Sequence, residues 1–81
     1  MEPFKLKLIK ASGTIFEGNV LSAKLKTISG EIQVLNNHAD CVGILDNSQI
    51  EIVEPNNSKQ VFEIAGGVCS VSDKILTIVA D

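Results

Sequence analysis

The chain has 81 residues, with seven lysines, no arginine and ten carboxylates, and its formal net charge is −3. A chain of this length forms one small domain, and 44% hydrophobic residues against 21% charged residues argue against disorder. The acidic balance and the few aromatic residues argue against nucleic-acid binding, and no segment approaches the ~20 apolar residues of a membrane span.

Alternation of apolar and polar residues recurs along most of the chain, which is typical of strands with one buried face. In chain order, this alternation predicts strands within residues 4–8, 21–26, 31–34, 49–52, 62–64 and 76–78. No window shows a helical period, so we expect an all-β domain. The residues expected in its core are Phe4, Leu8, Leu25, Ile52, Phe62, Ile64 and Ile78.

Turn-forming residues separate the predicted strands at residues 12–13, 29–30, 46–48, 55–58 and 72–74. A turn about every ten residues suits a sandwich or a barrel. The polar stretch at 35–40 predicts a loop. Gly66 and Gly67 interrupt what would otherwise be one strand from Val61 to Val71, which predicts a bulge or a close approach of the backbone.

No residues in the chain form a recognisable catalytic, cofactor-binding or metal site. His38 and Cys41 are three residues apart, about 10 Å on an extended backbone, which is too far for a nucleophile and its base. Gly66-Gly67 lacks the flanking pattern of a phosphate-binding loop. Cys41 and Cys69 are expected to be reduced, mostly buried thiols, because cysteine is among the residue types most often buried. We therefore expect no enzyme and no cofactor.

Three stretches, in order, resemble the epsilon subunit of F-type ATP synthases. They are TIFEGNV at residues 14–20, GEIQVLNNHAD at 30–40 and AGGVCSVSDKILTIVAD at 65–81. The chain departs from the family pattern at Asn36-Asn37, where a Pro-Gly pair is usual, at Asp40, where proline is usual, and at Cys69-Ser70. The loop before Cys41 is therefore expected to be less rigid than in the family.

The resemblance implies an all-β fold: a small flattened antiparallel β-sandwich or barrel of about eight to ten short strands. Residues 1–81 would be a single N-terminal β-sandwich domain, without the C-terminal helical pair that carries nucleotide sensing in the family. The implied function is that of a non-catalytic rotor subunit in the central stalk, which links the gamma subunit to the loops of the membrane c ring. The implied location is the cytoplasmic face of a bacterial inner membrane, or its organellar equivalent, without insertion of the chain itself.

The family pattern also implies which residues contact partners. We expect the segment from Glu31 to Asp40 to face the c ring, and His38 to lie near the gamma contact. The full predicted interface is Glu31, Ile32, Asn36, Asn37, His38, Ala39, Asp40, Cys41 and Val42.

An alternative is a lipoyl-type carrier domain modified at Lys74. Such domains are also small β-sandwiches, and they present their modified lysine at a hairpin tip, as the Asp73-Lys74 turn would. In carrier domains that lysine lies near the middle of the domain, whereas Lys74 is close to the end of this chain. The intact mass separates the two functions, because only the carrier would bear the mass of a lipoyl group.

Overall fold

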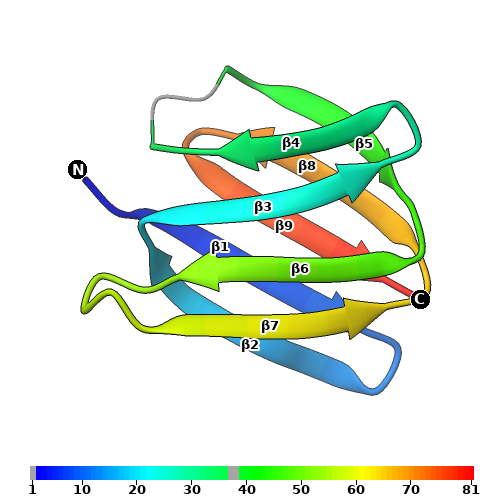
Figure 1. The fold of residues 1–81 in the computed structure, drawn as a ribbon, viewed down its shortest axis with the longest axis horizontal. Helices are drawn as coiled ribbons and strands as arrows, with labels where there is room; N and C mark the ends of the chain where they lie inside the picture. Colours follow the sequence, from blue (N-terminus) through cyan, green and yellow to red (C-terminus); the bar gives the residue numbers. More distant parts are fainter. Residues whose placement is uncertain (1, 37–38) are drawn as a thin grey trace.

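The computed structural model describes residues 2–36 and 39–81, and this part of the chain forms nine strands and no helix (Figure 1). The all-β prediction is therefore confirmed. In chain order the strands are β1 (Phe4–Lys10), β2 (Gly13–Val20), β3 (Ser22–Thr27), β4 (Gly30–Val34), β5 (Cys41–Leu45), β6 (Ser48–Val53), β7 (Lys59–Ile64), β8 (Gly67–Ser72) and β9 (Ile75–Ala80).

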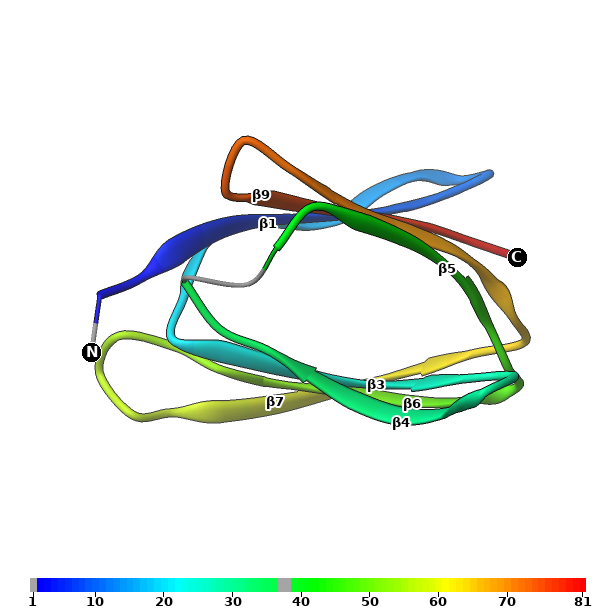
Figure 2. The same ribbon diagram turned by 90° about the horizontal axis from the view of Figure 1, so that it is seen from above.

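The nine strands form one sheet that folds over on itself into two layers, as Figure 2 shows. Layer 1 contains the strands in the order β2-β1-β9-β8-β5, and layer 2 contains them in the order β4-β3-β6-β7. The layers are joined at one end by the single pair Thr27–Leu45 between β3 and β5. The result is a sandwich with two open sides, one between β2 and β7 and the other between β4 and β5.

One strand pair departs from the antiparallel expectation: β1 and β9 run parallel, from Lys5–Ile75 to Ile9–Val79. This pair brings the first and last strands together at the centre of layer 1. All other pairs in the described sheet are antiparallel. Alternation within a strand looks the same for either direction, so the sequence pattern could not distinguish the parallel pair.

The core fills the space between the layers with the inward residues of both. Of the seven predicted core residues, all but Phe62 are buried. Phe62 is half-buried and contacts Phe16 across the open side between β2 and β7, with ring centroids 5.9 Å apart. The full set of buried apolar residues is Phe4, Leu6, Leu8, Val20, Ala23, Leu25, Val34, Leu45, Ile50, Ile52, Ile64, Cys69, Val71, Leu76, Ile78 and Ala80.

Strand β2 was not predicted, and an irregularity in its pairing with β1 explains the failure. The register shifts between Leu8 and Ile9, so that Phe16 pairs with Leu8 and Thr14 pairs with Ile9. Ile15 is the extra residue and is 42% exposed. A bulge of this kind moves the inward side of a strand by one residue, so the apolar residues Ile15 and Phe16 are adjacent and do not alternate. The next inward position, 18, is a glycine and gives no apolar signal.

Candidate functional site

The outer surface of β5, β8 and β9 carries no charged side chain. We call this surface the uncharged face; its residues are Val42, Ile44, Val68, Ser70, Ser72, Ile75, Thr77 and Val79. Five of these side chains are large, apolar and at least 41% exposed. Charged residues are depleted in the buried centre of protein interfaces, and contiguous exposed apolar surface marks interaction sites. The composition of this face therefore suits contact with another protein.

Strand register aligns the apolar residues of the uncharged face into a row. Ile44 pairs with Val68, Val68 with Val79, and Val79 with Ile9 on β1. Ile28 extends the row, because its backbone N–H donates to the carbonyl of Ile44 at 3.0 Å. The row thus crosses four neighbouring strands and reaches the β3–β4 turn, so the exposed apolar side chains form a continuous patch.

The outer face of layer 2 has the opposite composition. Its outward positions carry six charged residues, namely Lys24, Lys26, Glu31, Glu51, Lys59 and Glu63. Lys24 lies opposite Glu51 and Lys26 opposite Glu31 in the strand register. Charges of both signs in cross-strand pairs are typical of a sheet face in water. Within layer 1, β1 and β2 also carry outward charges, namely Lys5, Lys7 and Glu17. The lack of charge on β5, β8 and β9 therefore singles out the uncharged face as the candidate partner surface.

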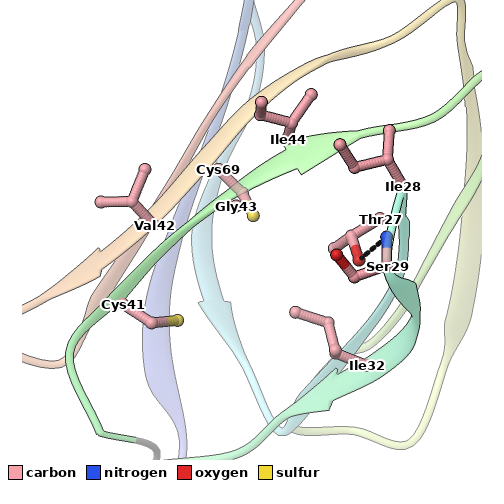
Figure 3. Close-up of a pocket in the computed structure, with 9 residues that line it drawn as sticks. All are labelled: Thr27, Ile28, Ser29, Ile32, Cys41, Val42, Gly43, Ile44 and Cys69. Atoms are coloured by element: carbon pink, nitrogen blue, oxygen red, sulfur yellow. Dashed lines mark hydrogen bonds between the residues drawn. The ribbon is translucent and has the colours of Figure 1, made fainter.

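A pocket of about 540 Å³ lies beside the uncharged face, on the side of the sandwich between β4 and β5. Figure 3 shows the side chains of Ile32, Cys41 and Cys69 pointing toward the opening, whereas Val42 and Ile44 point away from it on the far side of β5. None of its lining residues is charged. They are Thr27, Ile28, Ser29, Ile32, Cys41, Val42, Gly43, Ile44 and Cys69.

The buried hydroxyl in this pocket is already used by the local turn. Thr27 Oγ1 donates to the carbonyl of Gly30 at 2.8 Å and accepts from the backbone N–H of Ser29 at 3.1 Å. These bonds close the turn between β3 and β4, so Thr27 has a structural role. The surface that the pocket offers to a ligand is therefore mainly apolar.

The two cysteines lie on neighbouring strands at the pocket wall. Burial raises the pKa of the Cys69 thiol, and the nearby Cys41 raises it further. Gly43 makes room for the Cys69 sulfur, because a Cβ at position 43 would lie 3.2 Å from it. The raised pKa keeps Cys69 protonated, and a thiol in that form is a poor nucleophile and metal ligand. Both residues are thiols, as predicted, although Cys41 is only half-buried.

The predicted interface residues fall in two separate regions. Ile32, Cys41 and Val42 meet at the pocket. Glu31 lies near the start of β4, whereas Asn36 follows its end and donates through Nδ2 to Glu2 Oε2 at 3.2 Å. Figure 1 shows these two ends of β4 on opposite sides of the molecule. Ala39 and Asp40 are exposed and lie outside the strands; Asn37 and His38 lie outside the described residues.

Sequence reasoning did not identify most of the uncharged face. Ile44, Val68 and Val79 were not among the predicted interface residues, although each is about half exposed. A signal was present: residues 67–72 and 75–80 contain no charged side chain, whereas the outward positions of the strands at 22–27, 30–34, 48–53 and 59–64 include lysine or glutamate.

Two further observations concern membranes and metals. No helix in the described part of the chain is long and apolar enough to cross a membrane. Within residues 2–36 and 39–81, no group of three or more His, Cys, Asp or Glu could hold a metal ion.

Comparison with known proteins gives consistent matches. The family model for the β-sandwich domain of the ATP synthase delta/epsilon chain matches residues 3–81. The ATP synthase epsilon chain of Wolinella succinogenes is 32% identical over 81 residues, which are all of this chain and 62% of that protein. The chain thus spans less than two thirds of the length of this relative.

Two solved structures share the fold. A chain in the mitochondrial ATP synthase of Euglena gracilis, solved as an OSCP/F1/c-ring assembly, matches 96% of this chain and 50% of its own length, with a TM-score of 0.91 and 25% identity. A chain in the central stalk and c-ring structure of the Tetrahymena thermophila enzyme matches 94% and 61%, with a TM-score of 0.78 and 18% identity. The second likeness concerns the fold alone. The family match is to an ATP synthase chain and not to a lipoyl carrier domain. Lys74, the residue of the carrier alternative, is one of two residues with positive φ in the β8–β9 turn.

Proposed function

The chain belongs to the family of the β-sandwich domain of ATP synthase delta/epsilon chains, and from this premise we propose that it is a non-catalytic rotor subunit. In this role it binds the gamma subunit and rests on the polar loops of the membrane c ring, so that both turn together. It works at the cytoplasmic face of a bacterial inner membrane, or its organellar equivalent, and is held there by its partners.

The observation that supports the gamma contact is the uncharged face. A rotor subunit must stay attached to gamma through many turns, which favours a permanent and apolar interface. Sheet faces of the two layers differ in this respect: β5, β8 and β9 present exposed valine and isoleucine, while layer 2 presents paired charges. We therefore assign the uncharged face to gamma, and the layer 2 face to water except at its end beside the β3–β4 turn.

Two exposed valines of similar accessibility test this assignment. Val68 is 47% exposed at the centre of the uncharged face, and Val61 is 50% exposed on β7 in layer 2. Val68→Asp is expected to weaken binding of purified gamma roughly tenfold or more, since it places a charge in a desolvated interface. Val61→Asp is expected to leave the dissociation constant unchanged. Equal dissociation constants for the two variants, measured by calorimetry, would assign gamma to a different surface.

The c-ring contact requires a choice, because the two ends of the predicted segment lie on opposite sides of the molecule. We assign it to the end with the β3–β4 turn, where Glu31 is exposed. In the assembled enzyme, Glu31→Cys is expected to cross-link to a c-subunit loop, whereas Asp40→Cys at the other end is not. Both variants need Cys41→Ser and Cys69→Ser as background. Cross-linking from position 40 alone would reverse this orientation.

A further inference from the structure

The two open sides of the sandwich are filled differently. Between β2 and β7, the inward rings of Phe16 and Phe62 meet, with centroids 5.9 Å apart and planes tilted by 54°. Both rings pack against the core cluster. Aromatic pairs in this geometry bury large apolar area and attract each other through their ring edges. The chain therefore closes this side with its own side chains.

The side between β4 and β5 has no such pair among the described residues and holds the pocket of about 540 Å³ instead. Ile32 from β4 and Cys41 from β5 reach into it from its two edges (Figure 3). Atoms that line an unfilled apolar space lose the dispersion contacts that a partner would supply. A bulky apolar side chain in this pocket would therefore be stabilised, as Phe16 and Phe62 are on the other side.

The pocket is continuous with the uncharged face, because Val42 and Ile44 belong to both. The exposed edge of β5 lies between the pocket and the uncharged face. Pairing of β5 with β3 is limited to Thr27–Leu45, and the Ile44 carbonyl beside it accepts from Ile28. Since alternate residues of a strand direct their backbone groups to the same edge, the N–H and C=O of Val42 also point away from β8. An edge of this kind binds extended peptide segments.

We propose that the protein docked on the uncharged face sends an extended segment along β5 and inserts at least one bulky apolar side chain into the pocket between β4 and β5. This inference rests on the proposed function, in which that protein is gamma. We expect an uncharged occupant, because no lining residue carries a charge and the Thr27 hydroxyl is engaged within its own turn. An aromatic or long aliphatic side chain meets these requirements.

Filling the pocket tests the proposal. Ile32→Phe would extend a ring into the space that the partner side chain needs, while Gln33→Phe places the same ring on the outward side of β4, where Gln33 is exposed. Ile32→Phe is expected to weaken gamma binding by roughly 10- to 100-fold. Gln33→Phe is expected to bind like the unaltered chain, since its ring lies away from the pocket.

Chemical labelling gives a second readout that does not depend on a substitution in the pocket. Cys41 is half-buried and lines the pocket, so gamma should slow its reaction with N-ethylmaleimide about tenfold or more. Lys59→Cys, on the outer face of layer 2, should react at the same rate with and without gamma. Peptide mass spectrometry measures both rates in one sample, and this measurement decides the question if Ile32→Phe fails to fold.

The possible results distinguish failure of the pocket inference from failure of the proposed function. If gamma binds Ile32→Phe normally and Cys41 reacts equally fast in the complex, the pocket inference is wrong while the gamma contact stands. If gamma fails to bind the unaltered chain at all, the proposed function fails with it. Self-association of the isolated chain that Ile32→Phe abolishes would assign the pocket to a second copy instead and overturn the proposal.

Discussion

Gly67→Ala is expected to remove about 4 kcal/mol or more of stability, which is comparable to the total of about 3–5 kcal/mol for a domain of this size. Gly67 has φ +148, and a Cβ there would lie 2.3 Å from the Val79 carbonyl oxygen and 2.8 Å from the Ala80 Cα. Both atoms belong to the backbone of β9, so no side-chain rotation relieves the overlap. The methyl group would force β8 away from β9 at Gly67–Ala80, the first pair of the ladder.

The neighbouring Gly66 provides the matched control. Its φ of +135 is equally unfavourable for alanine, but an added Cβ would meet only the Asp81 carboxylate at 3.4 Å and the Leu45 carbonyl oxygen at 3.5 Å. Gly66→Ala therefore carries the conformational strain, about 1–3 kcal/mol, without the overlap. Urea denaturation, monitored by far-ultraviolet circular dichroism, gives the loss of stability in each of the two variants. Similar losses for the two variants would show that backbone strain, not the close approach of β9, requires glycine at 67.

Sequence patterns predicted the fold class, and six of the seven residues predicted for the core are buried, because inward and outward residues alternate clearly in β1, β3, β6 and β9. For the glycine pair they predicted a bulge or a close backbone approach, and the nearness of Gly67 to the backbone of β9 confirms the second alternative. They missed β2, where the bulge opposite Leu8 and Ile9 breaks the alternation. They missed the parallel β1–β9 pair as well, since it joins the two ends of the chain and leaves no local signal.

The candidate site was harder to predict than the fold, because it depends on which strands are neighbours. Ile9, Val79, Val68 and Ile44 come from four strands, of which only β8 and β9 are consecutive in the sequence, and they meet in the register of layer 1. Each looks ordinary alone, since a single exposed apolar residue is common on protein surfaces. The pocket likewise combines Ile32 with Cys69, which lie on different layers.

Ile52→Ala is expected to destabilise the domain by about 2–5 kcal/mol, and by more than Phe62→Ala, although phenylalanine is the larger residue. Ile52 is fully buried, and its strand β6 lies between β3 and β7. Truncation there leaves a cavity enclosed by both layers, which neighbouring side chains refill only in part. Phe62 is half-buried beside Phe16 at an open side, so water or movement of the Phe16 ring can occupy the space that its removal leaves.

The free energy of unfolding lost in Phe62→Ala therefore comes from the partial burial of the ring and from its contact with Phe16. That contact contributes about 0.5–1.5 kcal/mol. Val61→Ala, at a half-exposed neighbour on the same strand, is the control and is expected to cost less than either. The three free energies of unfolding, measured in urea at one pH, rank the sites by burial. A larger loss for Phe62→Ala than for Ile52→Ala would mean that the aromatic closure between β2 and β7 supports the domain more than its enclosed core does. That result would also raise the stabilisation expected from a partner side chain in the unfilled pocket between β4 and β5.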